Sequence, residues 1–151
     1  MNGLKRILLM EDNPKDVELT LAALDEHNLA NEVVVARDGA EGLDYLYIRG
    51  QFQMRPSGNP AVILLDLKMP KVDGLEVLRQ VKSDPALKAI PVVMLTSSRE
   101  EKDLVSSYNL GVNAYVVKPV NFQEFLNAVK ELGIFWAIIN EPPQDSVKKM
   151  K

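Results

Sequence analysis

Short apolar runs alternate with longer stretches of helical periodicity along this chain. The apolar runs are Arg6–Met10, Glu32–Ala36, Ala61–Leu65, Val92–Thr96 and Ala114–Val117. Three of these runs are almost continuous in Ile, Leu, Val or Met, which is typical of strands that are covered on both faces. The pattern therefore predicts five buried strands.

The stretches between the runs have the periodicity of amphipathic helices. Apolar residues share one helical face in two sets, which are Val17, Leu21 and Leu24, and Leu75, Leu78 and Val81. Strands that alternate with helices predict a (βα)₅ arrangement around a parallel sheet. The expected fold class is therefore α/β, doubly wound and flavodoxin-like, with the strand order 2-1-3-4-5 that is common for five strands.

Three polar residues stand where helix N-caps are expected. Asn13 is followed by Pro14, which suits the first helical position, and Asp16 lies in the first turn. Asp38 and Asn121 each have a glutamate three residues later, which is the spacing of a capping box. These signals predict where three of the helices begin.

Two segments depart from a minimal (βα)₅ plan. The connection Arg49–Pro60 is long and rich in Gly and Pro. The last apolar helical pattern continues past Gly133 to about Asn140, so we expect one helix through that position. The organisation that follows is one domain over residues 1–140 and a polar, disordered tail over residues 141–151.

Composition narrows the class of protein. A length of 151 residues with 46% hydrophobic and 26% charged residues suits one globular domain. The absence of cysteine excludes disulfides and thiolate metal sites, and a net charge of −3 argues against nucleic-acid binding. We see no secretory leader and no apolar stretch long enough to span a membrane, so we expect a cytoplasmic location and no membrane contact.

Polar residues with reactive side chains follow four of the predicted strands. Glu11 and Asp12 come after the first strand, Asp66 ends the third, Thr96 ends the fourth and Lys118 follows the fifth. Ligands bind beyond the carboxyl ends of the strands in a doubly wound sheet. We therefore expect these side chains to converge on one crevice.

The chemistry of this set is that of phosphoryl transfer. Three carboxylates repel one another unless a cation or protons intervene, and oxygen-only ligands favour Mg²⁺. A carboxylate such as Asp66 can form an acyl phosphate, while Lys118 and the Thr96 hydroxyl can contact the phosphoryl oxygens. A single carboxylate after a strand is more often a helix cap or a solvated charge. Here five reactive polar residues occur in order, each at the carboxyl end of a predicted strand, and this set indicates a functional site.

Four segments resemble the receiver domain of two-component response regulators. They are Ile7–Asn13, Leu64–Gly74, Val93–Ser97 and Tyr115–Pro119, which read ILLMEDN, LLDLKMPKVDG, VMLTS and YVVKP. The resemblance covers the chain from about Lys5 to Ile139, with every motif in order.

The resemblance implies a role for each residue at the site. Asp66 would be the phosphoacceptor, with Glu11 and Asp12 as the acidic pair. Mg²⁺ would bind to Asp12, Asp66 and the backbone carbonyl of Lys68. Lys118 would contact the phosphoryl group. Transfer and hydrolysis would be self-catalysed, so the protein would be a phosphoacceptor and not an enzyme for other substrates.

The resemblance also implies a conformational switch. Thr96 would be the switch hydroxyl and Tyr115 the switch aromatic, and the bond between Lys118 and Pro119 would be cis. The helix expected over residues 100–108 has few apolar anchors and would report the switch. The alternative for Tyr115 is a packed strand aromatic without a switching role.

The expected partners are proteins. A sensor histidine kinase would supply the phosphoryl group. The long connection and the ending after Leu132 resemble the receivers paired with phytochrome-type kinases of bacteria and cyanobacteria. Ile134, Phe135 and Ile138 make the end of the last helix apolar on several sides, which predicts a homodimer surface or, alternatively, extra packing on its own domain.

Three other functions are compatible with parts of the pattern. A small Mg²⁺-dependent phosphohydrolase with an aspartyl-phosphate would need a second acid/base carboxylate, but Lys68 stands two places beyond Asp66. A flavodoxin-type electron carrier would need a phosphate cradle after the first strand, where Glu11 and Asp12 would repel phosphate. A constitutive scaffold would not need the complete residue set.

Overall fold

The computed structural model describes residues 7–97, 114–134 and 138. Within them lies a parallel sheet of five strands, β1 (Ile7–Met10), β2 (Val33–Ala36), β3 (Val62–Asp66), β4 (Val92–Thr96) and β5 (Ala114–Val117). The strand order is β2-β1-β3-β4-β5. The predicted fold class and strand order are confirmed, and the strand limits differ from the predicted runs by at most one residue.

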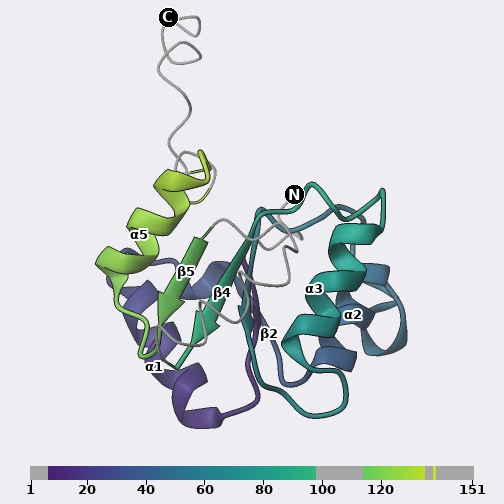
Figure 1. Ribbon diagram of the computed structural model, residues 1–151, viewed down its shortest axis with the longest axis horizontal. Coiled ribbons are helices and arrows are strands. Elements are labelled where there is room, and N and C mark those ends of the chain that lie inside the picture. The colour runs from purple at the N-terminus through teal and green to yellow at the C-terminus, as the bar shows by residue number, and fades with distance from the viewer. Residues whose placement is uncertain (1–6, 98–113, 135–137, 139–151) are drawn as a thin grey trace, which may run out of the picture.

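Helices cover both faces of the sheet (Figure 1). The structure describes α1 (Pro14–Asp25), α2 (Gly39–Tyr47), α3 (Gly74–Ser83) and α5 (Phe122–Glu131), with short 3₁₀ turns η1 (Ala30–Glu32) and η2 (Gly50–Phe52). α1 and α5 lie on one side of the sheet, and α2 and α3 lie on the other. The reporter helix expected over residues 100–108 lies outside the described residues.

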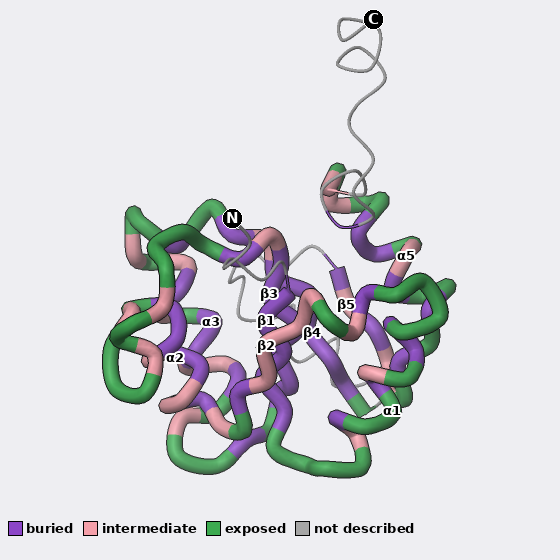
Figure 2. The backbone as a smooth tube through the Cα atoms, turned by 180° about the vertical axis from the view of Figure 1, so that it is seen from behind, coloured by how far each residue is buried: buried purple, intermediate pink, exposed green. Residues whose placement is uncertain are grey.

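The three central strands, β1, β3 and β4, are buried on both faces because each contributes alternate side chains to two separate cores. Ile7 and Leu9 pack in the core that α1 and α5 cover. Leu8 and Met10 pack in the core that α2 and α3 cover, and all four side chains are fully buried. Figure 2 shows this burial as purple central strands with exposed loops and helix faces around them. The continuous apolar runs follow directly from this double coverage.

The predicted helix caps are present. The Oδ1 atoms of Asn13, Asp38 and Asn121 accept a backbone N–H of the first turn at 2.8, 2.7 and 2.8 Å. Asp73, for which no cap was predicted, caps α3 in the same way at 3.0 Å. These bonds satisfy donors that a helix leaves free at its start.

Arg55 organises the long connection Arg49–Pro60. Its Nε donates to the carbonyl of Tyr45 at 2.8 Å, and its Nη1 donates to the carbonyl of Gly58 at 3.0 Å. The guanidinium lies 4.0 Å from the centre of the Tyr45 ring, while Phe52 meets the same ring edge-on at 5.1 Å. The connection is therefore an ordered loop that packs on α2.

The prediction of one helix running through Gly133 is wrong. α5 ends at Glu131, and Gly133 takes a left-handed backbone with φ of 75°. The Gly133 N–H donates to the carbonyl of Lys130 at 3.0 Å, and the Ile134 N–H donates to the carbonyl of Val129 at 3.0 Å. This pair of bonds is a Schellman motif, which closes a helix at a glycine.

Ile134 and Ile138 lie beyond this break. Ile138 is helical, and its N–H donates to the carbonyl of Ile134 at 3.2 Å. Ile138 is fully buried in the core under α1 and α5, and Ile134 packs against the same core. Both residues thus pack on their own domain, while Phe135 and the predicted tail over 141–151 lie outside the described residues. In the part of the chain that the structure describes, no helix has the length and apolarity to span a bilayer.

Candidate phosphoacceptor and metal site

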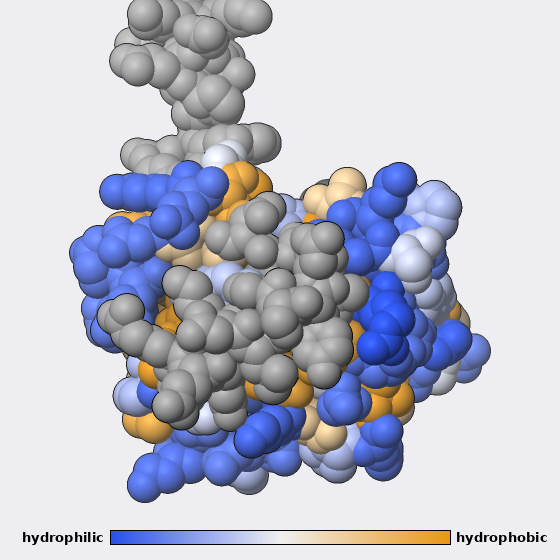
Figure 3. Space-filling model, viewed as in Figure 1, coloured by the Kyte–Doolittle hydropathy of each residue, from blue (hydrophilic) through white to orange (hydrophobic). Residues whose placement is uncertain are grey.

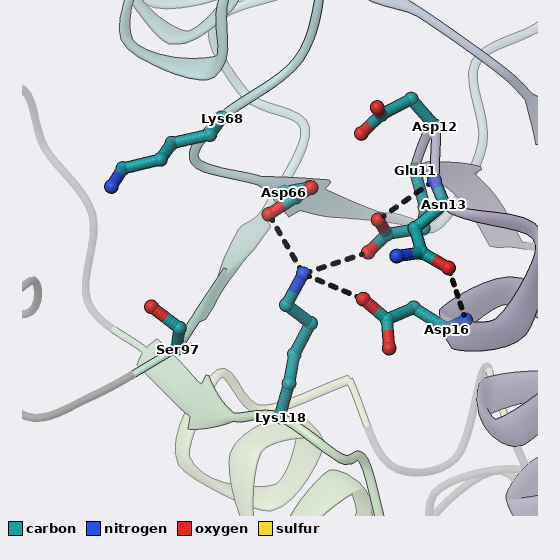
Figure 4. Close-up of a pocket in the computed structure, with 8 residues that line it drawn as sticks. All are labelled: Glu11, Asp12, Asn13, Asp16, Asp66, Lys68, Ser97 and Lys118. Atoms are coloured by element: carbon teal, nitrogen blue, oxygen red, sulfur yellow. Dashed lines mark hydrogen bonds and ion pairs between the residues drawn. The ribbon is translucent and has the colours of Figure 1, made fainter.

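The carboxyl ends of β1, β3, β4 and β5 surround one open pocket (Figure 4). Its lining consists of Glu11, Asp12, Asn13, Asp16, Asp66, Lys68, Ser97 and Lys118. The structure therefore brings together the predicted residues Glu11, Asp12, Asp66 and Lys118. Thr96 lies next to the pocket, as the last residue of β4.

Glu11 lies at the base of the pocket and Asp12 lies at its opening. The Glu11 side chain is fully buried, and its backbone N–H donates to the carbonyl of Ala36 at 3.0 Å, which extends the sheet. Its Oε2 accepts the backbone N–H of Asn13 at 3.3 Å. Asp12 is exposed. The two neighbouring carboxylates thus sit in different environments.

Asp66 is fixed by a tight turn after β3. It is only 5% exposed, and the backbone N–H of Lys68 donates to its carboxylate. The Gly74 N–H donates to the carbonyl of Leu67 at 3.0 Å. A Cβ atom at Gly74 would lie 2.2 Å from the Asp66 carbonyl oxygen, so only glycine allows this approach. The side chain of Lys68 is exposed and points away from Asp66 (Figure 4).

The three carboxylates are crowded. One oxygen each of Glu11, Asp12 and Asp66 can be chosen so that all lie within 4.8 Å of one another. Burial, and then the charge of Asp66, raise the pKa of Glu11 to about 7. Burial also raises the pKa of Asp66, although Glu11 and Lys118 oppose that shift. Without a cation the site therefore retains protons more readily than exposed carboxylates do.

Lys118 is the cation at the centre of this cluster. Its Nζ donates to Glu11 Oε1 at 3.3 Å, to Asp66 Oδ1 at 3.3 Å and to Asp16 Oδ2 at 3.0 Å. Burial alone would lower the pKa of Lys118, but the bond to Asp16 and the charges of Asp66 and Glu11 raise it above its ordinary value. The lysine therefore remains charged.

Thr96 presents a spare donor beside the site. The residue is fully buried, and its hydroxyl has no hydrogen-bond partner within the described structure. Its backbone carbonyl accepts the N–H of Lys118 at 2.7 Å, and the Lys118–Pro119 peptide bond is cis, as the resemblance implied. Tyr115 is half-buried against the core under α2 and α3. Since Met94 pairs with Tyr115 and Thr96 with Val117, Thr96 and Tyr115 lie on the same face of the sheet.

The donor set fits a hard divalent cation. The carboxylate oxygens are close together, Asp12 is open to solvent, and no histidine or cysteine is among the described residues that line the pocket. Burial is the main cause of the raised pKa of Glu11, and a cation there would offset the second cause, which is the charge of Asp66. The position of the Lys68 carbonyl as a fourth ligand stays a prediction.

Sequence reasoning missed three residues of the pocket. Asn13 was predicted only as a cap, Asp16 only as a first-turn acid, and Ser97 was not assigned a role. A helix that begins just after β1 has its first turn at the carboxyl edge of the sheet, which was the available signal for Asn13 and Asp16. The position of this turn does not reveal which of its side chains contacts Lys118.

The fold and this site define a class of signalling proteins. Residues 7–130 match the model of the response regulator receiver domain. The chain belongs to this family.

One relative in this family is similar in both sequence and structure. Response regulator Rcp1 of Synechocystis sp. is 40% identical over 135 residues, which are 89% of this chain and 90% of that protein. The Mn²⁺-bound form of Rcp1 superposes with a TM-score of 0.68 at 40% identity, over 87% of this chain and 94% of that one.

Two further solved structures are similar over most of their length. The bacteriophytochrome response regulator AtBRR is 67% identical with a TM-score of 0.84, covering 88% of this chain and 95% of that chain. The phosphorylated cyanobacterial phytochrome response regulator RcpA is 44% identical with a TM-score of 0.69, covering 89% and 94%. This chain is thus a response regulator receiver related to phytochrome response regulators.

Proposed function

We propose that Asp66 is the phosphoacceptor of this receiver and takes its phosphoryl group from a phosphohistidine of a sensor histidine kinase. The observation that carries the proposal is the contact of Lys118 Nζ with Asp66 at 3.3 Å, inside a cluster of three carboxylates. In the transfer, the P–N bond of the donor breaks and a P–O bond to an Asp66 carboxylate oxygen forms. The imidazole keeps the electron pair of the broken bond. Hydrolysis of the acyl phosphate then restores Asp66 and releases phosphate.

The chain's own residues orient this reaction. Asp66 must attack as the ionised carboxylate, and the charge of Lys118 favours that form against the effect of burial. The ammonium of Lys118 can contact first the carboxylate and then the phosphoryl oxygens while it stays in the pocket. The turn at Gly74 holds the nucleophile in place, so little reorganisation is needed.

The metal in this proposal is Mg²⁺. Asp12, Asp66 and the Lys68 carbonyl would hold it. Glu11 would act on it less directly, because its two oxygens already accept from Lys118 Nζ and Asn13 N–H. When bound, the ion offsets the negative charge of the carboxylates and of the phosphoryl group. The Mn²⁺-bound form of the relative Rcp1 supports a divalent ion of this kind.

Thr96 and Tyr115 would convert phosphorylation into a change of surface. The unpartnered Thr96 hydroxyl is a donor for a phosphoryl oxygen, and a shift of Thr96 would open space for Tyr115 on the same face of the sheet. Such a local charge change can bias an element with two arrangements.

The output would pass through protein contacts in the cytoplasm. The similarity to AtBRR and RcpA favours a phytochrome-type kinase as the phosphodonor. A homodimer through Ile134, Phe135 and Ile138 belongs to this proposal, although the packing of Ile134 and Ile138 gives that segment an intramolecular role as well. A phosphohydrolase for outside substrates has no support in the site. The residue two places beyond Asp66 is Lys68, with its side chain directed away from the nucleophile.

The test is intact mass spectrometry after incubation with acetyl phosphate. We expect one added phosphoryl group with Mg²⁺, none with a chelator and none for Asp66→Asn. Circular dichroism would show that the variant is folded. A wild-type protein that is folded yet gains no mass, and that also shows no change of its thermal midpoint with beryllofluoride and Mg²⁺, would contradict the proposal.

A further inference from the structure

Lys118 has a third acidic partner that the proposed phosphoryl transfer does not use. The shortest of the three contacts of its Nζ is to Asp16 Oδ2, at 3.0 Å. Asp16 belongs to the first turn of α1, whereas Glu11 follows strand β1 and Asp66 ends strand β3. The ammonium is therefore held from three separate elements, and all three of its N–H donors are engaged (Figure 4).

This contact differs from an ordinary surface ion pair. Surface pairs contribute little to stability because water screens them and both side chains lose rotamer freedom. Here the side chains of Lys118 and Asp16 are only 17% and 25% exposed. Asp16 is also held at its backbone, because its N–H donates to the Asn13 cap at 3.3 Å. The carboxylate is thus placed by the start of α1 and not by the lysine alone.

We infer that Asp16 is a positioning residue that holds the ammonium of Lys118 beside Asp66. This inference rests on the proposed role of Asp66. When the phosphoryl group forms, one of its oxygens takes over the N–H that now points to Asp66, while the bonds to Asp16 and Glu11 persist. The lysine then has three acceptors before and after the transfer and needs no new rotamer.

Two opposing effects of Asp16 can be separated by experiment. Its negative charge repels the incoming phosphoryl group, so removal of the charge alone would speed the reaction. Its oxygen fixes the lysine, so removal of the acceptor would slow the reaction. Positioning requires the second effect to dominate. A charge-assisted hydrogen bond contributes more than a neutral one, and asparagine keeps an acceptor oxygen at the same distance along the side chain.

The experiment compares Asp16→Ala with Asp16→Asn and the control Glu18→Gln. Glu18 is an exposed acid on the same helix, so its variant removes a charge from α1 away from Lys118. Phosphorylation by acetyl phosphate with Mg²⁺ is followed by intact mass at several donor concentrations. We expect the saturating rate to fall about tenfold for Asp16→Ala and about two- to threefold for Asp16→Asn, with Glu18→Gln unchanged.

Rescue by asparagine is the result that a structural role would not give. Equal rates for Asp16→Ala and Asp16→Asn, or an increase in both, would overturn the inference. Thermal melts of each variant identify any loss of fold. If Asp16→Ala is unfolded, the folded Asp16→Asn decides against the wild type: a rate slower by about two- to threefold supports the inference, and an equal or faster rate overturns it. The wild-type and Asp66→Asn arms report the proposed function separately, so a failure of Asp66 chemistry cannot be mistaken for a failure of Asp16.

Discussion

At the scale of single residues, the site is an arrangement of charges that cannot all ionise without help. Glu11 and Asp66 are buried side by side, and Lys118 is the only cation that contacts both among the described residues. One positive charge cannot compensate three or four carboxylates, so protons or a divalent ion must supply the difference. Stability, metal affinity and reactivity are therefore linked through the same few side chains.

We expect the metal-free protein to lose stability as the pH rises toward neutrality. The pKa of Glu11 is about 7 in the folded protein against an ordinary 4.5, so the folded state binds this proton more tightly than the unfolded state does. Its contribution is complete below pH 4.5 and is lost as the pH rises through 7, with a slope of at most about 1.4 kcal/mol per pH unit. Urea unfolding in the presence of a chelator at about pH 5 and about pH 8 measures this change in the free energy of unfolding.

The control for this titration is Glu11→Gln, which mimics the protonated acid. We expect the variant to show a flatter dependence of unfolding free energy on pH than the wild type. Saturating Mg²⁺ should flatten the wild-type curve as well, because the ion replaces the proton. Parallel curves for wild type and variant would show that Glu11 is not the titrating group.

Thr96 gives the opposite kind of prediction, in which a substitution stabilises the protein. Its hydroxyl is buried without a hydrogen-bond partner within the described structure, which costs free energy. Valine has nearly the same shape and no polar atom, so we expect Thr96→Val to raise the unfolding free energy by about 1 kcal/mol. Urea unfolding with an unchanged m-value would show this. A less stable variant would mean that the hydroxyl already has a partner.

At the scale of elements, local signals at the chain's turns decide where helices begin and end. The side-chain caps start α1, α2 and α5, and the left-handed Gly133 stops α5 although the apolar pattern continues. A hydrophobic pattern reports which face is buried, but it does not report whether the backbone stays helical. A left-handed glycine with the two hydrogen bonds of a Schellman motif ends the helix even where the hydrophobic pattern continues.

Gly133 offers a clean test of backbone conformation. A Cβ atom there would meet nothing within 4 Å, so a substitution would act only through the positive φ. We expect Gly133→Ala to lower the unfolding free energy by about 1 kcal/mol and Gly133→Asn to lower it by less, because asparagine tolerates the left-handed region better. Thermal and urea unfolding would measure both. A stabilised alanine variant would mean that α5 can continue through residue 133.

At the scale of the whole molecule, the sheet gathers the site at one edge, and few large apolar side chains of the described residues are exposed. Only three large hydrophobic residues of the described part are exposed, and they lie on α1, α2 and the loop after η2. Figure 3 likewise shows apolar residues on the visible face as separate patches among hydrophilic ones. In the described part of the chain, the exposed large hydrophobic side chains are therefore scattered over three separate segments.

The proposed homodimer can be tested against intramolecular packing of the same segment. Ile138 is fully buried in its own domain, so we expect Ile138→Asp to lower the thermal midpoint strongly. The homodimer proposal instead expects Phe135→Asp to shift a dimer to a monomer. Sedimentation velocity and thermal melts, with and without beryllofluoride and Mg²⁺, measure the two effects. A monomeric wild type in both states would contradict the homodimer.

The sequence by itself determined the sheet, its strand order, the helix caps and the meeting of Glu11, Asp12, Asp66 and Lys118. The sheet follows from local periodicity, the caps follow from the residue types at helix starts, and the strand order is the common one for five strands in this fold class. The four side chains meet because parallel strands end at one edge of the sheet.

Only the tertiary structure decided how the side chains share the pocket. Glu11 is fully buried while its neighbour Asp12 is exposed, and Asp16 reaches Lys118 from 102 residues away in the chain. The tertiary structure also turned the apolar residues Ile134 and Ile138 onto their own core after α5 had ended. Contacts of this kind depend on the relative placement of packed elements to within about an ångström, and hydrogen bonds disappear beyond that tolerance. No pattern along the chain contains that distance.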